Sequence, residues 1–403
     1  MIRLLATISL YALVVRISPR FGGTAVGRYV ITTLARQCAA DSPAVIKIAQ
    51  LISGRAQFSD RYFCEGLLKL QADVSPNCWF RGEVDETWFA KIDQRALASG
   101  SVGSVFRATL LSGAPVVIKV KDLHREEKHL KSARTFRSIS TLANRIMSVW
   151  NIPALDWINA LTPVFRGQFD FDSERANALQ FAEAFRRVDG VVIPRCYAQH
   201  SNPVALVYER IEELAVISEE LNGTQRGTRA ADILLKAYFK MVFIDGLIHC
   251  DLHAGNVYLN AKGDVVILDY GYVERITDRV KVKFRKFFGA IVSGNSNLCA
   301  ALIVDMATSR AKRYKEFEFF TAIGDLVEQF HGRRAGDVDV GKFIMAVFVT
   351  CARSGVRVES WFANILVSLA FLQGTLVKLD SSLDFQLEAK RLLHTLEEGA
   401  IGL

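Results

Sequence analysis

Hydrophobic and polar positions in the first half of the chain predict strands joined by tight turns. Between residues 96 and 120, a run of small residues precedes one apolar segment. A turn over residues 111–114 then leads into a second apolar segment. Apolar segments bounded by Gly, Ser and Pro in this way are typical of a β-hairpin. Residues 204–209 are apolar again and end in an acid, so we expect a further strand there.

The second half of the chain has mostly the spacing of helices. We expect a connecting loop over residues 212–229, a helix over residues 230–246, and a largely helical tail over residues 337–403. Residues 278–288 carry five basic side chains among apolar ones. As a helix they would form a solvated basic face or a surface that contacts anionic lipid head groups. The apolar residues 361–372 predict a buried core helix.

The composition is that of a globular protein. The chain has 403 residues, of which 50% are hydrophobic and 23% are charged. It can therefore bury one large core or a few smaller ones, and a disordered chain is excluded. The formal net charge of +8 suits an anionic partner such as a nucleotide, an acidic lipid or a nucleic acid, without choosing among them.

The seven cysteines are scattered along the chain and form no C-x-x-C pair. An odd, dispersed set indicates a reducing compartment and argues against a disulfide framework. Since no cluster of Cys and His has the spacing of zinc ligands, we do not expect a zinc site.

Apolar runs bear on membrane attachment. None reaches the roughly 18 residues that a bilayer span requires, so we expect no transmembrane helix. Residues 4–15 come nearest, and they fit a short signal-like segment, an interfacial helix or a buried first helix. Because no convincing small-residue cleavage site follows, we favour an uncleaved helix that touches the core or a membrane surface.

The strongest chemical signal is the segment His-Cys-Asp-Leu-His-Ala-Gly-Asn at residues 249–256, followed thirteen positions later by Asp-Tyr-Gly from Asp269. Asp251 could orient or deprotonate a nucleophile, while Asn256 and Asp269 could hold Mg²⁺ against nucleotide phosphates. The order and spacing resemble the H-R-D-L-x-x-x-N and D-F-G elements of protein kinases.

A buried histidine–aspartate pair often has only a structural role, so the flanking residues matter. Residues 265–268, Val-Val-Ile-Leu, form a short apolar run that leads directly into Asp269. A metal-binding acid at the end of a strand is expected to follow such a run. The flanks therefore favour phosphoryl-transfer chemistry over a structural pair.

The predicted hairpin supplies residues suited to bind a nucleotide. Small residues in its first turn would let backbone amides approach phosphate closely. They are Ala98, Ser99, Gly100, Ser101 and Val102. Lys119 lies among apolar β-branched residues, where an unpaired charge is costly. It is either an edge-strand lysine that reaches water or a phosphate-binding lysine that pairs with a helical glutamate, for which Glu174 is the candidate. Glu209 ends the next strand, a natural position for the link between two lobes.

The residues quoted so far resemble the UbiB family of atypical kinases, also called ADCK kinases, over about residues 43–385. Lys47 and Gln50 resemble that family's K-x-G-Q helix, and their spacing of three would place both on one helical face. In the family this helix folds over the active site with both side chains pointing inward. Without the resemblance, the segment would be interpreted as a surface helix.

Three other elements carry the resemblance. The loop at residues 98–101 stands where the family has an alanine-rich loop. Gln168 begins the segment that corresponds to the family's E-x-D element, and Glu174 and Asn177 follow at matching positions. Residues 373–380 look like the family's C-terminal helical stretch.

Several positions depart from the family pattern. Gly100 and Gly103 make the nucleotide loop more similar to that of protein kinases and more flexible. Gln168 removes a charge, Ala254 replaces a proline, and Tyr270 replaces the phenylalanine of D-F-G. The acids, the amide and the lysine of the site are all retained, so we expect Mg-nucleotide chemistry to be intact.

The resemblance implies an α+β fold, bilobal and protein-kinase-like, with a family-specific N-terminal helical extension and a helical C-terminal lobe. An N-terminal helical segment, with an interfacial position as one alternative, is expected at residues 1–42, and the K-x-G-Q-type extension at residues 43–95. The N-lobe, with the nucleotide loop, lysine strand and glutamate helix, is expected at residues 96–210. The C-lobe, with the catalytic loop, the metal-binding aspartate and a helical tail, is expected at residues 211–403.

The implied activity is that of an ATP-dependent phosphotransferase or ATPase with ATP and Mg²⁺ as cofactors, acting in isoprenoid quinone (ubiquinone) or related lipid metabolism. Asp251, Lys119 and Glu174 would be catalytic. A nucleotide-binding pseudokinase scaffold that regulates partner enzymes is the alternative. A protein kinase is disfavoured, because the N-terminal element would block a polypeptide and no A-P-E motif follows Gly271.

The expected partners are a nucleotide, an isoprenoid lipid or membrane surface, and quinone-biosynthesis proteins, whereas no nucleic acid is expected. Many bacterial family members add membrane-spanning helices after the kinase-like part, and this sequence ends at Leu403. We therefore expect a cytoplasmic protein or one that is peripheral at the inner membrane surface.

Overall fold

The computed structural model describes residues 84–99, 102–122, 169–311, 314–332 and 340–397. They fall into two compact units. The first unit holds the described residues up to Asp172, together with residues 196–210. The second unit holds residues 173–195 and the described residues from Ile211 onward. Each unit is described by itself.

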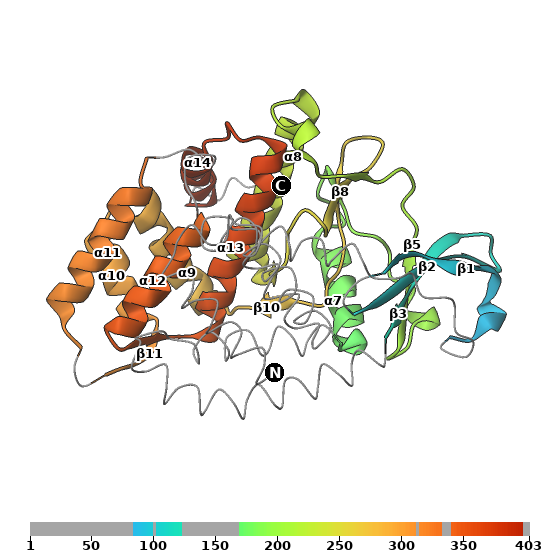
Figure 1. Ribbon diagram of the computed structural model, residues 1–403, viewed down its shortest axis with the longest axis horizontal. Coiled ribbons are helices and arrows are strands. Elements are labelled where there is room, and N and C mark those ends of the chain that lie inside the picture. Colours follow the sequence, from blue (N-terminus) through green and yellow to red (C-terminus); the bar gives the residue numbers. More distant parts are fainter. Residues whose placement is uncertain (1–83, 100–101, 123–168, 312–313, 333–339, 398–403) are drawn as a thin grey trace, which may run out of the picture. The chain divides into compact units, whose positions relative to one another are not determined.

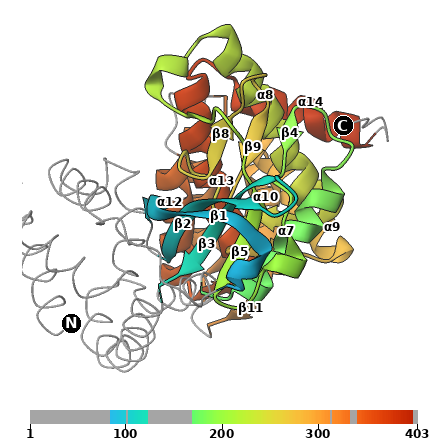
Figure 2. The same cartoon turned by 90° about the vertical axis from the view of Figure 1, so that its right-hand side faces the viewer.

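An antiparallel sheet is the centre of the first unit. Its strands within the described residues, in spatial order, are β1 (Phe89–Ser99), β2 (Gly103–Leu110), β3 (Pro115–Lys121) and β5 (Ala205–Glu209) (Figure 2). Alternate side chains of β3 enter the core, where Val116 and Ile118 are completely buried. Phe106 from β2 and Val207 from β5 pack in the same cluster. Short 3-10 turns, η2 (Glu86–Trp88) and η4 (Ala198–His200), also belong to this unit.

The strands predicted on either side of the turn at residues 111–114 are confirmed as β2 and β3, and the strand predicted at residues 204–209 is confirmed as β5. Strand β1 was not anticipated as a long strand. Its side chains from Lys91 to Arg95 do not alternate in burial, and its pairing with β2 shifts register at three places. The period-2 pattern on which strand prediction depends is therefore absent from it.

The second unit contains short strands around the segment with the strongest chemical signal. Strands β4 (Val191–Val192), β9 (Val265–Ile267), β8 (Val257–Leu259) and β6 (Ala215–Val216) form one sheet in this order. Strand β7 (Leu247–His249) pairs with β10 (Val273–Arg275). All three residues of β9 are completely buried, so the strand predicted just before Asp269 is confirmed.

Helices make up most of the second unit. They are α7 (Phe171–Ala184), whose first two residues group with the first unit, α8 (Gln225–Phe239), α9 (Asp278–Val292), α10 (Ser296–Asp305), α11 (Glu316–Phe330), α12 (Val340–Arg353), α13 (Ser360–Leu379) and α14 (Phe385–Glu397). Helices α11, α12 and α13 pack side by side, in orange to red in Figure 1. The helical tail expected over residues 337–403 is confirmed within residues 340–397. The addition there is the short strand β12 (Val356–Val358), which pairs with β11 (Ala307–Arg310).

Helix α8 begins earlier than the sequence predicted. We expected a loop that ends at residue 229 and a helix that starts at residue 230. The helix instead starts at Gln225, inside the predicted loop. The Thr224 side chain caps it by accepting a hydrogen bond from the Gly227 amide at 3.0 Å. The first turn exposes Gln225 and Arg226, so it lacks the apolar spacing that signals a helix. Helix α8 continues into a wider π-helical turn, η6 (Lys240–Asp245).

Helix α9, predicted over residues 278–288, is confirmed and extended to Val292. Two of its basic side chains make local contacts. Lys281 donates to the carbonyl oxygen of Ile244 at 2.6 Å, and Lys283 pairs with Asp305 at 2.7 Å. These two lysines fasten the helix to neighbouring segments, whereas Arg279 and Lys286 are exposed. Contact of this face with anionic lipid stays a hypothesis.

Helix α13 matches the core helix expected over residues 361–372. Within the described part of the chain it is also the helix that meets the length and hydropathy of a membrane span. Its interior position accounts for this composition, because 61% of the apolar window is buried within the protein. Phe362 shows the packing: it is completely buried, and its ring lies 5.0 Å from that of Phe287 in α9.

The helical segment predicted at residues 1–42, most of that predicted at residues 43–95, and Lys47, Gln50 and Gln168 lie outside the described residues. The helical prediction is wrong for the last residues of the second segment, because strand β1 begins at Phe89. The proposed boundaries at residues 96–210 and 211–403 stay predictions. From residue 173 onward, helix α7, which we placed with the N-lobe, groups with the second unit.

Asp380 ends α13 and provides a test of how the helices of the second unit are joined. Its carboxylate accepts from Thr228 in α8 at 2.8 Å and from Ser382. Burial would raise the pKa of Asp380, but these hydrogen bonds together outweigh burial and hold the pKa below its ordinary value. Its stabilising contribution is therefore complete above about pH 4 and is lost as the pH falls further.

We expect Asp380→Asn to lower the free energy of unfolding by about 1–2 kcal/mol at pH 7. The difference from the wild type should shrink as the pH falls below about 4, because protonation of the carboxyl then removes its stabilising contribution. Urea denaturation at several pH values measures both effects. Asp325→Asn, at an exposed position of α11, is the matched control and should change stability by less than about 0.5 kcal/mol. A difference that does not depend on pH would contradict the role of the carboxylate.

Candidate functional site

His249 organises the start of the segment with the strongest chemical signal. It is the last residue of β7 and is completely buried. Its Nε2 lies 3.1 Å from the carbonyl oxygen of Leu268, and its Nδ1 lies 3.2 Å from the backbone nitrogen of Asp251. Because a carbonyl accepts and an amide donates, the ring carries its proton on Nε2. Burial lowers the pKa of His249, which keeps the imidazole neutral and this pattern intact.

Cys250 lies between His249 and Asp251 in the sequence, and its surroundings indicate a structural role. It is completely buried, and its thiol lies 3.5 Å from the carbonyl oxygen of Ile248. Burial raises the pKa of the Cys250 thiol well above its usual value. A thiol that stays protonated is a poor nucleophile, so the chemistry of the segment belongs to its carboxylate and amide.

Asn256 is tied directly to the backbone of Asp251. Its side-chain nitrogen donates to the carbonyl oxygen of Asp251 at 2.9 Å, and its backbone nitrogen donates to the carbonyl oxygen of His253 at 2.8 Å. Only the nitrogen of the amide can face a carbonyl, so the side-chain oxygen points away from Asp251. Both Asn256 and Asp251 are buried, with 8% and 3% of their surface exposed. An oriented amide oxygen of this kind is a suitable ligand for Mg²⁺.

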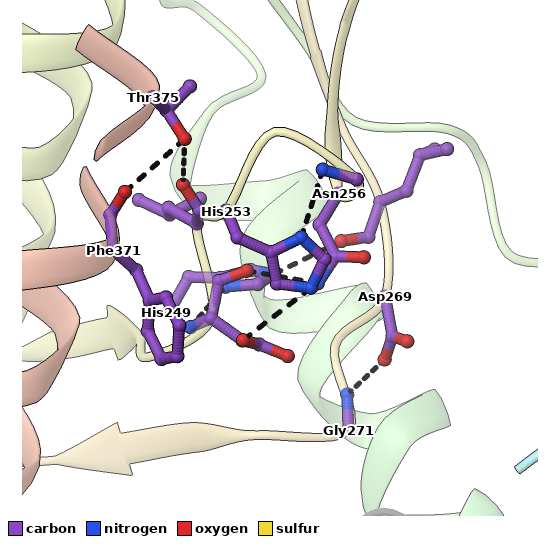
Figure 3. Close-up of polar contacts among 11 residues, drawn as sticks. His249, His253, Asn256, Asp269, Gly271, Phe371 and Thr375 are labelled. Atoms are coloured by element: carbon purple, nitrogen blue, oxygen red, sulfur yellow. Dashed lines mark hydrogen bonds and ion pairs between the residues drawn. The ribbon is translucent and has the colours of Figure 1, made fainter. Parts of the chain in front are cut away.

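Strand pairing brings Asp269 to the same place. Val257 of β8 stands opposite Ile267 of β9, and the Leu268 amide donates to the carbonyl oxygen of Asn256 at 2.9 Å. Asn256 therefore precedes β8 at the end of the sheet where Asp269 follows β9 (Figure 3). The backbone of Asp269 is in the left-handed region, with φ of 62°. Its carboxylate accepts from the Gly271 amide at 3.2 Å.

Helix α7 fixes the segment that follows Asp269. The Asn177 side chain donates to the carbonyl oxygen of Tyr270 at 2.8 Å and accepts from Arg275 at 2.5 Å. Phe181, one helical turn further, places its ring 5.3 Å from that of Tyr270 and 6.0 Å from that of His249. These contacts explain why most of α7 groups with the second unit.

His253 lies beside the carboxylate of Asp251. Its Nδ1 accepts from the Gly255 amide at 2.9 Å, which leaves the ring proton on Nε2, 3.7 Å from Asp251 Oδ1. Gly255 is required by this arrangement. A Cβ atom at that position would lie 2.7 Å from the imidazole of His253, so any larger residue would displace the ring.

In the first unit, the predicted lysine lies over an aromatic ring. Lys119 Nζ is 5.5 Å from the centroid of the Phe171 ring, where the ring face attracts a cation. The ammonium group of Lys121, two residues further along β3, lies 5.2 Å from the same centroid. Lys121 is almost completely buried, with 8% of its surface exposed. Two lysines on one face of a strand concentrate positive charge.

The predicted nucleotide loop is described in part. Ala98 and Ser99 end β1, Val102 precedes β2, and the Ser99 hydroxyl lies 2.9 Å from that of Ser104. Gly100 and Ser101 lie outside the described residues. A Cβ atom on Gly103 would lie 2.0 Å from the carbonyl oxygen of Val120. This glycine therefore allows β2 and β3 to approach closely, which is a packing role rather than the flexibility that we expected.

The structure brings three of the predicted site residues together within the second unit: Asp251, Asn256 and Asp269. Glu174 lies in α7 and is buried, with 1% of its surface exposed. Lys119 belongs to the first unit, so its pairing with Glu174 stays a prediction. Glu209 is exposed at the end of β5.

Comparison with known proteins shows the family of the chain. The model of the ABC1 atypical kinase-like domain matches residues 81–303, which is more than half of the chain. The chain belongs to the ABC1 atypical kinase-like family. The resemblance to UbiB kinases and the kinase-like α+β fold, both expected from the sequence, are thereby confirmed.

Individual relatives show the same similarity. The probable protein kinase UbiB of Vibrio vulnificus is 26% identical over 373 residues, which cover 87% of this chain and 68% of the relative. UbiB of Pasteurella multocida is 24% identical over 392 residues, which cover 90% and 73%. An uncharacterised Synechocystis protein, slr0889, is 25% identical over 289 residues, 66% of this chain and 71% of that protein.

A solved structure, the complex of Rv3197 with erythromycin from Mycobacterium tuberculosis, has a similar fold. The TM-score is 0.54 and the sequence identity is 19%, over 76% of this chain and 78% of the other. At this identity the likeness establishes the ABC1-type fold alone.

The donor set of this ABC1-family site fits Mg²⁺. The described residues contain no group of three or more His, Cys, Asp or Glu that could hold a metal by themselves. Nucleotide-bound Mg²⁺ needs fewer protein ligands, because it uses one or two protein oxygens together with phosphates and water. The oriented amide oxygen of Asn256 and the Asp269 carboxylate provide such a pair.

Two contacts at the site were missed by the sequence analysis. Lys121 could have been found, because its spacing of two from Lys119 places both on one face of a strand. Thr375 in α13 donates to the carbonyl oxygen of Leu252 at 2.7 Å, next to Asp251. No local pattern signals this hydrogen bond, since its two residues are 123 positions apart.

Asn177 gives a test of how α7 is fixed. We expect Asn177→Ala to lower the free energy of unfolding by about 1–3 kcal/mol, because the buried carbonyl of Tyr270 would lose its partner. Gln180→Ala is the matched control: Gln180 also accepts from Arg275, at 3.1 Å, but it is exposed. That change should cost less than about 0.5 kcal/mol. Urea denaturation compares the two variants, and equal losses would contradict the proposed role of the Asn177 amide.

Proposed function

We propose that this protein binds Mg-ATP and transfers the terminal phosphoryl group, as an atypical kinase or ATPase. One observation carries the proposal. Asn256 and Asp269 lie at the same end of the β8–β9 pair, and the Asn256 side chain is hydrogen-bonded to the backbone of Asp251. A catalytic acid and two oxygen ligands in such an arrangement suit phosphoryl transfer, which depends mainly on positioning and charge stabilisation.

In this proposal each side chain has a distinct task. Asp251 orients the attacking hydroxyl or water, or accepts its proton, and Asn256 and Asp269 hold Mg²⁺. Bound Mg²⁺ would neutralise charge on the phosphate oxygens. Lys119 and Glu174 position the phosphates. The amides of the loop from Ala98 to Val102 cover them, and the segment near Glu209 receives the base.

The proposed acceptor is water or a small lipid-like molecule. This rests on the resemblance to the UbiB family, in which the helix that corresponds to Lys47 and Gln50 covers the site. It also supports a role in isoprenoid quinone (ubiquinone) or related lipid metabolism, with quinone-biosynthesis proteins or a membrane surface as partners. A cytoplasmic location, or a peripheral one at the inner membrane surface, follows from the same proposal.

A nucleotide-binding scaffold that regulates partner enzymes is the second candidate. Gln168 favours it, because this residue replaces the acid that the family has at that position. Such a protein would bind Mg-ATP without useful turnover. A protein kinase is less favoured, since a covered site would exclude a polypeptide.

ATP turnover by the purified full chain tests the enzyme proposal. We expect Mg²⁺-dependent release or transfer of phosphate, with and without vesicles of anionic lipid. Asp251→Asn and Asp269→Asn should each lower kcat about 100-fold or more, because each removes a charge that acts on the reacting groups. Asp305→Asn is the matched control, since Asp305 lies at the end of α10 and pairs with Lys283. Its rate should equal that of the wild type.

The outcomes separate the candidates. If Mg-ATP binds but turnover equals that of Asp269→Asn, the enzyme proposal is wrong and the scaffold is supported. Phosphate transfer to generic protein substrates would instead support a protein kinase. Removal of Mg²⁺ with a chelator should abolish turnover, and persistence of turnover would contradict the proposed metal ligands.

A further inference from the structure

Helix α13 reaches the catalytic loop through one hydroxyl group. Thr375 is buried, with 1% of its surface exposed, and its Oγ1 donates to the carbonyl oxygen of Leu252 at 2.7 Å (Figure 3). The carbonyl oxygen of Phe371, on the preceding turn, lies 3.3 Å away and is the weaker partner. Leu252 is completely buried. The hydrogen bond therefore holds a carbonyl group that water does not reach.

The preceding turn of α13 supports the next residue of the loop. The Phe371 and His253 rings meet edge to face, with centroids 6.0 Å apart. Residues 371 and 375 share one face of the helix because they are four apart. His253 Nε2 in turn lies 3.7 Å from Asp251 Oδ1. One face of α13 thus contacts both residues that follow Asp251.

The hydrogen bonds around Asp251 show what α13 adds. The backbone nitrogen of Asp251 faces His249, and its carbonyl oxygen accepts from Asn256. Both partners belong to the same segment of chain as Asp251. The contact from Thr375 to Leu252 comes from a helix more than a hundred residues away in sequence. It fixes the position of the loop relative to the body of the second unit.

Helix α13 is itself held at both ends. Near its start, Asn364 donates to Glu274 of β10 at 2.5 Å. At its end, Asp380 accepts from Thr228 of α8. A helix fixed at two points presents the residues between them, including Thr375, in a defined place.

We propose that Thr375, assisted by Phe371, is a positioning residue for Asp251. This inference rests on the proposed phosphoryl-transfer function. It assigns to α13 the placement of the Asp251 carboxylate for the transfer step. The carboxylate must be placed within a fraction of an ångström of its productive position, since a misplacement of about 1 Å can reduce a rate about 100-fold. Among the described residues, the hydrogen bonds of Thr375 go to the carbonyl oxygens of Leu252 and Phe371 and not to residues proposed to bind the nucleotide. Its loss should therefore lower kcat and leave nucleotide affinity unchanged.

The decisive comparison uses two buried hydroxyls of the same helix. Thr375→Val removes the hydroxyl with little change in shape. Ser368→Ala removes one that bonds Tyr238 and the Ile365 carbonyl, two turns away from the catalytic loop. If Thr375 merely stabilised the helix, both variants would affect Tm and activity alike.

For the full chain with Mg-ATP, we expect Thr375→Val to lower kcat about 10–100-fold. KM for ATP and the Kd of the nucleotide should stay within about twofold. Ser368→Ala should keep the wild-type kcat at a comparable loss of Tm, and Thr375→Ser, which restores the hydroxyl, should recover most of the rate. Phe371→Leu, which acts on the same helix face through His253, should lower kcat in the same way and decides the matter if Thr375→Val does not fold.

Three results would overturn the inference: an unchanged kcat in Thr375→Val, an equal loss in Ser368→Ala, or a rise in KM that accounts for the whole effect. Asp251→Asn, measured alongside, separates this failure from failure of the proposed function. A wild-type rate equal to that of Asp251→Asn rejects both the function and the inference. A wild-type rate above it, with Thr375→Val unaffected, rejects the inference alone.

Discussion

The hydrogen bond from the Asn256 side chain to the carbonyl oxygen of Asp251 joins the proposed catalytic acid to the proposed metal ligands. It orients the amide oxygen of Asn256 and fixes the backbone of the acid in one contact. The pairing of β8 with β9 then places Asp269 beside them. The neutral ring of His249 bridges the Leu268 carbonyl oxygen and the Asp251 amide. Because these groups are tied to one another through backbone atoms, strand pairing fixes the core of the site, and side chains of α7 and α13 support it from outside.

Helix α7 groups with the second unit because its side chains contact the segment around Asp269. In the second unit, the amide of Asn177 and the ring of Phe181 hold the segment that follows Asp269. In the first unit, the ammonium groups of Lys119 and Lys121 in β3 lie over the ring of Phe171. Each unit thus builds its own charged region from its own contacts. A pairing of Lys119 with the helical glutamate would link the two units, and it remains a proposal.

Much of this architecture could be predicted from the sequence, for reasons that differ between elements. Strands β3 and β9 were predicted because their apolar residues are short runs bounded by turn residues, whereas β1 was missed because its exposed charged side chains break the alternation. The start of α8 was missed because its first turn is polar and depends on the cap at Thr224. At the site, the spacing of Asp251 and Asn256 could be read locally. The contact of Thr375 could not, because tertiary packing alone brings it to the loop.

The left-handed backbone at Asp269 narrows the substitutions that can survive there. Gly, Asn and Asp tolerate this conformation better than other residues, whose Cβ atoms are crowded in it. An aspartate at position 269 therefore adopts this conformation at low energetic cost. Asn and Gly are the substitutions that suit the same conformation. Either would remove the charge and remain compatible with this backbone conformation. If Asp269 holds Mg²⁺ as proposed, one such substitution would remove the metal ligand and keep the backbone conformation of this segment.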